Sequence, residues 1–152
     1  MEELEELILE NYRNILCKLG LEDIKIEIGT GFYSYPSINT IEIPIFETNP
    51  EGAKYFYNDF IKRLGTNECS LEIASFLHEL GHIQTYKKNN DIIYCILAPI
   101  ISFIQNHFEN EKIFCLMQKI YFNLPLEKRA TEWAIKILKE NQKYFKKLLT
   151  NI

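Results

Sequence analysis

The residues best suited to chemistry in this 152-residue chain are His78, Glu79 and His82. They belong to the segment HELGH, inside an apolar stretch, residues 68–88, whose periodicity predicts a helix. Residues four apart lie on the same face of a helix, so the two imidazoles can bind one metal ion together. Glu79 lies one position round the helix, where its carboxylate can act on water at the metal. The spacing predicts a bound Zn²⁺.

The helical projection of residues 68–88 separates an apolar face from the histidines. One arc holds Ile73, Phe76, Leu77, Leu80 and Ile83, and His78 and His82 fall on the opposite side. Two of the three histidines in the chain therefore share this side, with a glutamate between them, which favours ligands over ordinary surface histidines. Gly81 lowers helix stability by about 1 kcal/mol relative to alanine. Close approach by another backbone segment or by a substrate would explain the glycine, and the alternative is a glycine that the helix merely tolerates.

A catalytic zinc site usually has three protein ligands and one open position. The last predicted helix has an inward stripe of Ala130, Ala134, Leu138 and Phe145. Glu127 lies on this stripe and Glu132 projects away, so Glu127 is the predicted third ligand. A metal ion would compensate its burial. A second interpretation also stays open, in which Glu127 only caps its own helix N-terminus.

Residues 78–82 and 127–134 (EKRATEWA) together resemble the gluzincin metallopeptidases. Many of these carry H-E-x-G-H on one helix and E-x-x-A-(N/D)-x-x-A on a second. ImmA/IrrE-type peptidases and the minimal gluzincins share this HExxH plus ExxA pattern. The chain departs from it in two places: Thr131 stands where the pattern has Asn or Asp, and residues 91–122 insert two helices between the motifs.

The resemblance implies a zinc-dependent hydrolase. By that resemblance His78, His82 and Glu127 are the zinc ligands and Glu79 is the catalytic acid/base. It also implies a sheet whose edge strand binds the substrate in extended form, a role that residues 40–46 could fill.

The expected activity is hydrolysis of peptide bonds in a peptide or protein, as in an endopeptidase. Zinc lowers the pKa of bound water to about 7, and Glu79 would accept the proton. Tyr86, one turn after His82, is the first candidate for the donor that stabilises the oxyanion, followed by Tyr121 and His107.

A catalytically inactive zinc-binding module for regulation or protein interaction is the alternative. A fourth position closed by His107 would indicate a structural metal site. A large exposed apolar patch on residues 92–104 would indicate docking of a partner protein. The oligomeric state stays open.

Periodicity and turn residues predict an α+β class: a mainly helical, zincin-like single domain over residues 1–152, with a small, mostly antiparallel N-terminal sheet. Pro44 removes a backbone donor, so the strand at 40–46 is expected at an exposed sheet edge. The expected helices are 2–19, 50–65, 68–88, 90 or 91–107, 110–122 and 125–149, and the expected strands are 24–28, 32–35 and 40–46.

Composition limits the class of protein. The chain is 47% hydrophobic and 25% charged with net charge −4, which lacks the basic excess of a nucleic-acid-binding protein. The apolar run 92–104 contains Pro99 and is shorter than a membrane span, so no membrane insertion is expected. The N-terminus does not resemble a signal peptide, and cytoplasmic residence is expected. Four widely spaced cysteines in apolar stretches predict buried free thiols: Cys17, Cys69, Cys95 and Cys115.

Overall fold

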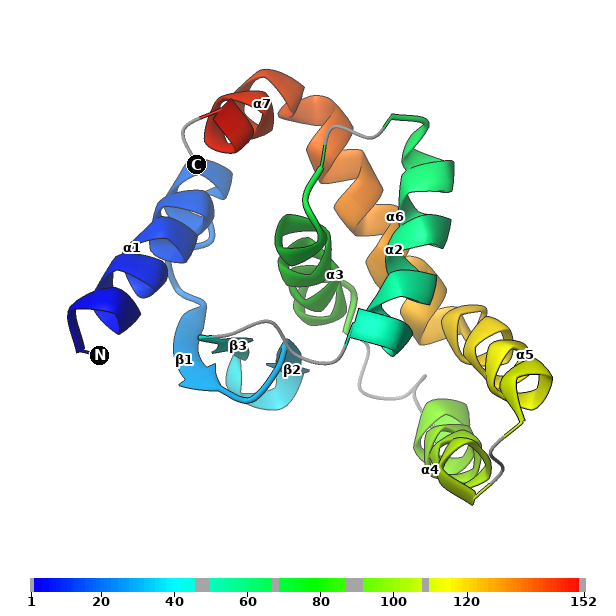
Figure 1. Cartoon of the computed structure of the whole chain (residues 1–152). Helices are drawn as coiled ribbons and strands as arrows, with labels where there is room; N and C mark the ends of the chain where they lie inside the picture. Colours follow the sequence, from blue (N-terminus) through cyan, green and yellow to red (C-terminus); the bar gives the residue numbers. More distant parts are fainter. Residues whose placement is uncertain (1, 46–49, 67–68, 87–91, 108–109, 151–152) are drawn as a thin grey trace. The chain divides into compact units, whose positions relative to one another are not determined.

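The computed structural model describes residues 2–45, 50–66, 69–86, 92–107 and 110–150. The chain is mainly helical with one small mixed sheet, which confirms the α+β class (Figure 1). Its backbone forms two compact units, Met1–Pro50 and Glu51–Ile152. The two units are described in turn.

The first unit joins one helix to the sheet. Helix α1 (Glu2–Leu19) is followed by β1 (Lys25–Gly29), β2 (Tyr33–Tyr35), a 3-10 turn at Pro36–Ile38 and β3 (Thr40–Pro44). The helix ends at Gly20, whose φ of 68° suits a residue without a side chain. α1 packs against β1. Ile15, Leu16, Ile24, Ile41 and Ile43 are buried.

Strand β3 is the centre of the sheet, so its predicted place at the edge is wrong. The strand order is β1-β3-β2. Pro44 is tolerated because it is the last residue of β3 and lies beyond the pairing with β2, which stops at Glu42. The sheet is also mixed rather than mostly antiparallel, since β1 pairs with β3 in parallel and β2 pairs with β3 antiparallel. Alternating apolar residues are compatible with both directions, so the sequence pattern does not determine the strand direction.

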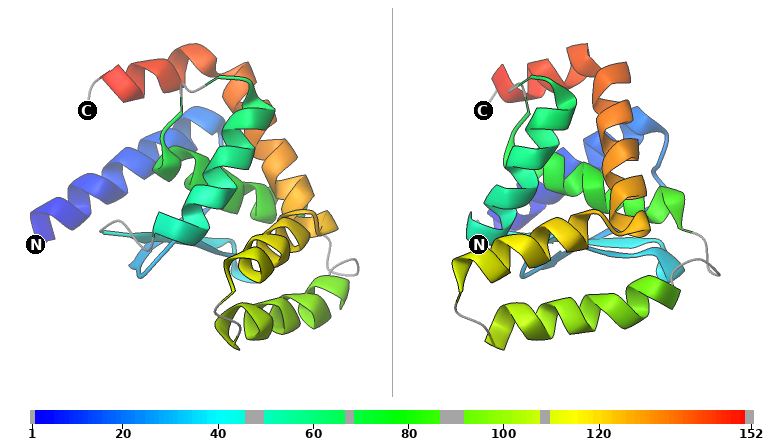
Figure 2. Two further views of the ribbon diagram at one scale, coloured as in Figure 1. Left: turned by 45° about the vertical axis from the view of Figure 1, so that its right-hand side comes forward. Right: turned by 90° about the vertical axis from the view of Figure 1, so that its right-hand side faces the viewer.

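The regular elements that the structure describes in the second unit are all helices. Its elements are α2 (Pro50–Leu64), α3 (Leu71–Thr85), α4 (Ile92–His107), α5 (Glu111–Phe122), α6 (Pro125–Glu140) and α7 (Gln142–Thr150). α3 and α6 make the most extensive contact between described elements, and α4 packs against α5 as a hairpin (Figure 2). Phe60, Phe76, Leu77, Leu80, Ala130 and Ala134 form the centre of this unit and are fully buried.

The helices expected over residues 68–88 and 125–149 differ from those observed. α3 begins after Ser70, whose hydroxyl accepts a hydrogen bond from the Ile73 N–H at 3.3 Å. The last helix is divided at Asn141, where φ is −115°. The Asn141 side chain donates to the Ile137 carbonyl at 3.1 Å and competes with continuation of the helix. The predicted cap at Asn90 or Asp91 lies outside the described residues.

The cysteines do not share one environment. Cys69 is buried, as predicted, but Cys17 and Cys115 are exposed, so the prediction is wrong for these two. Both lie on amphipathic helices, α1 and α5, and are on the exposed side of them. The side chain of Cys95 lies outside the described part of the structure.

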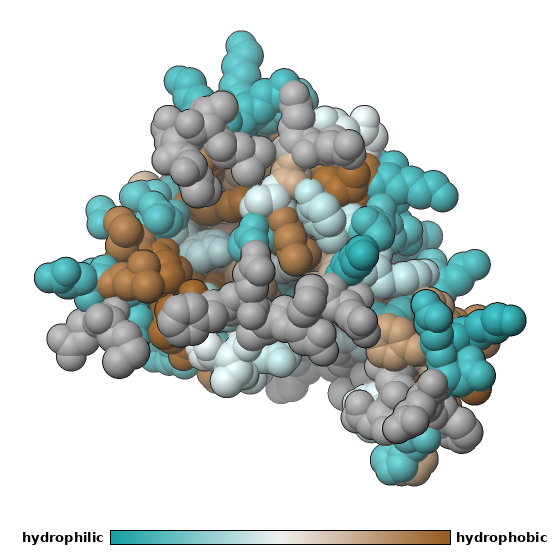
Figure 3. All heavy atoms as spheres, viewed as in Figure 1, coloured by the Kyte–Doolittle hydropathy of each residue, from teal (hydrophilic) through white to brown (hydrophobic). Residues whose placement is uncertain are grey.

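Exposed apolar residues occur in both units. Figure 3 shows hydrophobic atoms gathered over α1, from which Leu4 and Leu7 are exposed. Within the described residues, no helix combines the length and the apolar character needed to cross a bilayer.

Candidate metal centre

Helix α3 places His78 and His82 one turn apart on a buried face. The two side chains are 5% and 7% exposed. Phe76, Leu77 and Leu80 fill other sides of the same helix and are fully buried. The histidines therefore face helix α6 across a packed boundary rather than an open surface.

Gly81 allows this packing. A Cβ at this position would lie 2.4 Å from the carbonyl oxygen of Ala130, closer than any real contact. The backbones of α3 and α6 thus approach where no side chain fits between them. The alternatives for Gly81 are resolved by this contact, because a neighbouring backbone segment accounts for the glycine.

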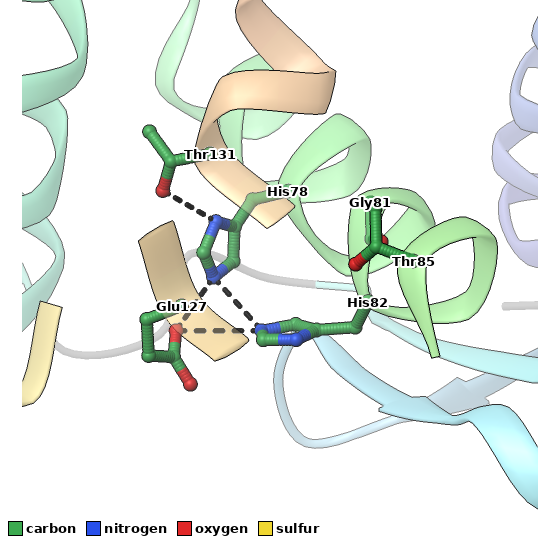
Figure 4. A network of polar contacts seen from close by, with 6 residues as sticks. All are labelled: His78, Gly81, His82, Thr85, Glu127 and Thr131. Atoms are coloured by element: carbon green, nitrogen blue, oxygen red, sulfur yellow. Dashed lines mark hydrogen bonds and ion pairs between the residues drawn. The ribbon is translucent and has the colours of Figure 1, made fainter. Parts of the chain in front are cut away.

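The close approach brings Glu127 of α6 to the two histidines (Figure 4). Glu127 Oε2 lies 2.9 Å from His78 Nε2 and 3.3 Å from His82 Nε2. The two Nε2 atoms are 3.1 Å apart. Three atoms that can each offer a lone pair to a cation therefore form one small triangle.

Thr131, one turn after Glu127, holds the far side of His78. Its Oγ1 lies 3.1 Å from His78 Nδ1, and the side chain is 4% exposed. With the Nδ1–H donating to this hydroxyl, the lone pair of His78 is on Nε2 and points into the triangle. Thr131 is thus a buried hydrogen-bond partner that orients the His78 ring.

The triangle is close in size to a metal site and slightly smaller. Bonds of about 2.0–2.1 Å in a tetrahedral zinc site place ligand atoms about 3.3–3.4 Å apart. The distances of 2.9, 3.1 and 3.3 Å fall at or a few tenths of an ångström below that separation. Glu127 Oε1, which is also buried, has no hydrogen-bond partner among the described residues. A cation between the three groups would compensate the buried carboxylate.

Electrostatics keep Glu127 ionised. Burial at 1% exposure raises the pKa of its carboxyl group. Without a metal ion, hydrogen bonds donated by the Nε2–H groups of His78 and His82, together with the charge of these rings when they are protonated, outweigh burial and hold the pKa of Glu127 below its ordinary value. Glu127 is therefore an anionic group among imidazoles, as a ligand for a divalent cation must be.

Glu79 lies beside the triangle and is half-buried. The potential ligand atoms of His78, Glu79 and His82 lie within 4.8 Å of one another, so this group could hold a metal ion. Glu79 is thus more exposed than Glu127, which is 1% exposed.

Aromatic rings enclose the outer side of His78. Phe56 of α2 meets the His78 ring edge-on, with their ring centroids 4.9 Å apart. The ring centroid of Phe122 of α5 lies 6.4 Å from that of His78. Phe56 and Phe122 also pack on each other at 5.4 Å. These rings fix the orientation of His78 and lower the local dielectric constant, which strengthens the charge interactions at the site.

The other predicted residues lie in different surroundings. Glu132 is exposed and forms an ion pair with Lys128 at 3.8 Å, in line with its outward projection. His107 is exposed at the end of α4, where its Nδ1 is 2.9 Å from the Phe103 carbonyl oxygen. Tyr86 follows the last residue of α3 and is 40% exposed. Its role as an oxyanion donor stays a prediction.

Sequence reasoning missed the contributions of Thr131 and Phe56. Thr131 follows Glu127 by four residues, and this spacing alone could have placed both on one face toward His78. Phe56 carried no comparable signal, because its contact with His78 depends on how α2 packs in three dimensions.

Comparison of the chain with protein-family models, with curated proteins and with solved structures finds no match in any of the three.

Proposed function

We propose that this protein is a zinc-dependent metallopeptidase of the gluzincin type. The observation that carries the proposal is the convergence of His78 Nε2, His82 Nε2 and Glu127 Oε2, with the Glu79 carboxylate alongside. Two imidazoles and one carboxylate form a donor set of catalytic zinc sites. A zinc ion held there would act as a Lewis acid toward water and a peptide carbonyl.

Each residue has a separate task in this proposal. His78, His82 and Glu127 hold the metal. The Thr131 hydroxyl keeps the His78 proton on Nδ1. Glu79 accepts a proton from the attacking water on its carboxylate and delivers it to the nitrogen of the departing amine.

The substrate in this proposal is a peptide or protein. Phe56 and Phe122 limit water access to His78 from the side of α2 and α5. Tyr86 is the proposed donor to the oxyanion, a role that exposure at the end of α3 permits.

The second candidate function is a metal-binding module without turnover. The exposed apolar residues of α4, Ile96, Ile100 and Phe103, favour this alternative, because a peptidase mechanism does not require them. Both candidates share the metal site and differ in whether Glu79 performs proton transfer.

Two measurements on the purified full chain separate these functions. Metal analysis after reconstitution is expected to give one zinc per chain. A library of quenched fluorescent peptides is expected to show cleavage that Glu79→Gln abolishes while zinc content stays unchanged. Absence of zinc would refute the site. Stoichiometric zinc without cleavage would favour the inactive module, and cleavage that survives Glu79→Gln would assign the activity to a contaminant.

A further inference from the structure

Helix α4 carries an exposed apolar stripe that the proposed peptidase function does not use. Ile96, Ile100 and Phe103 are 58%, 50% and 59% exposed. Spacings of four and three residues place them on one side of the helix. His107, a further four residues on, stacks on Phe103 at 4.0 Å and extends the stripe.

The stripe is also free of charge. No Asp, Glu, Lys or Arg occurs between Ile92 and His107. α6 is a helix of the same length and shows the usual solvated pattern, with Lys128, Glu132, Lys136, Lys139 and Glu140 at exposed positions. The exposed side of α4 therefore has the composition of a helix surface that is normally covered.

The neighbouring helix shows the same feature. α5 packs against α4 and exposes Leu116 and Ile120, which are 53% and 41% exposed and again four residues apart (Figure 2). The hairpin of residues 92–122 thus exposes apolar residues from both of its helices.

We propose that the α4–α5 hairpin is a homodimer interface, in which the stripe of one copy packs against the stripe of a second copy. The stripe has the spacing of the a and d positions of a heptad repeat, which form the seam where two helices pack. Its residues Ile96, Ile100, Phe103 and His107 follow one another by four, three and four positions. The surface complementary to such a seam is another helix with the same spacing, and this chain supplies one. A twofold interface brings a patch against its own copy. The α4 stripe has no charged residue, so two copies of it can meet without repulsion between like charges.

The size of the hairpin sets the expected affinity. Helices of 16 and 12 residues are about 24 Å and 18 Å long at 1.5 Å per residue. Covering one such face in each copy removes roughly 1,000 Å² from water, which is near the lower limit for a specific interface. The dimer is therefore a weak one that dissociates on dilution.

The test is light scattering coupled to size-exclusion chromatography, on the full chain over a dilution series. The wild-type mass is expected to rise from monomer to dimer with concentration. Ile100→Glu combined with Phe103→Glu is expected to weaken dimerisation more than tenfold, because it buries like charges at the seam. Ile38→Glu removes an equally exposed apolar residue, at 68% exposure, from the other unit and should leave the dimer intact.

Circular dichroism establishes whether the double variant is folded, and Ile100→Gln replaces it if it is not. A wild-type chain that remains monomeric at every soluble concentration overturns the proposal. A dimer that persists in the Ile100→Glu, Phe103→Glu double variant and in Ile100→Gln also overturns the proposal. Sedimentation with phosphatidylcholine–phosphatidylglycerol vesicles is the competing assay: a monomer that binds them through the stripe would assign this face to a lipid surface. None of these outcomes depends on zinc or on peptidase activity.

Discussion

At the scale of single residues, the contact between Thr131 and His78 is the most informative feature of the site. A hydroxyl is a weaker hydrogen-bond acceptor than a carboxylate, so Thr131 would orient His78 with less increase in ligand basicity than an Asp or Glu would give. It also adds no second negative charge beside the buried Glu127. Glu127 would therefore be the one buried carboxylate among the three proposed ligands that compensates the charge of a metal ion.

Thr131→Val keeps the shape of the side chain and removes the hydroxyl. His78 then loses the partner at 3.1 Å that fixes its tautomer, and the affinity for zinc is expected to fall about 10–100-fold. Competition with a chromogenic chelator measures the affinity. Thr131→Ser is the matched control and should stay close to wild type. Equal affinities in the two variants would show that the hydroxyl does not orient His78.

Cys69 gives a pH-dependent prediction away from the site. Burial, with a smaller effect of Glu72, raises the pKa of its thiol from 9.0 to about 12. The folded state thus keeps a proton that the unfolded state loses above pH 9.0. The stability due to this group is complete below pH 9.0 and declines as the pH rises toward about 12.

The decline amounts to at most about 1.4 kcal/mol per pH unit. Urea unfolding of wild type and Cys69→Ala across this pH range measures the difference in slope, and equal slopes would contradict the assignment. Native Cys69 should also resist alkylation below pH 9.0, while the exposed Cys17 and Cys115 react.

At the scale of elements, the contact of α3 with α6 determines the geometry of the site. Gly81→Ala tests it. Alanine in a helix interior increases the stability of the folded state by about 1 kcal/mol relative to glycine. Overpacking decreases that stability by about 1–3 kcal/mol. The group 2.4 Å from the added Cβ is a backbone carbonyl, which cannot rotate away, so a net loss of stability of up to about 2 kcal/mol is expected.

Urea unfolding measures the stability of Gly81→Ala, and the chelator assay should show weaker zinc binding, since Glu127 moves with α6. Gln84→Ala, at an exposed position of the same helix, is the control and should be nearly neutral. A Gly81→Ala protein as stable as wild type would mean that α3 and α6 can separate without penalty.

The elements also show where sequence reasoning succeeds. Helix limits at Gly20, Asn110 and Pro125 follow from local backbone preferences, so they were predictable. Pairing in the sheet was not, because the apolar alternation of Ile41 and Ile43 is the same in a central strand and in an edge strand. In the site, the i and i+4 relation of His78 and His82 is local, whereas contact with Phe56 and Phe122 depends on tertiary packing.

At the scale of the whole molecule, metal binding should stabilise one of the two compact units. All three proposed ligands belong to the unit Glu51–Ile152, and so does Trp133, the single tryptophan of the chain. Trp133 fluorescence therefore follows unfolding of the unit that would hold the metal. Free zinc at about 100 times its dissociation constant adds about 2.7 kcal/mol to the stability of the native state.

For a unit of this size the added stability corresponds to a rise of roughly 10–20 °C in the Trp133-monitored melting temperature. Glu127→Gln should abolish most of the rise, because an amide is a poorer zinc ligand than a carboxylate. Glu132→Gln is the matched control: it makes the same chemical change at an exposed position of the same helix and should keep the full rise. An equal rise in both variants would exclude Glu127 as a ligand and leave a metal held by α3 alone.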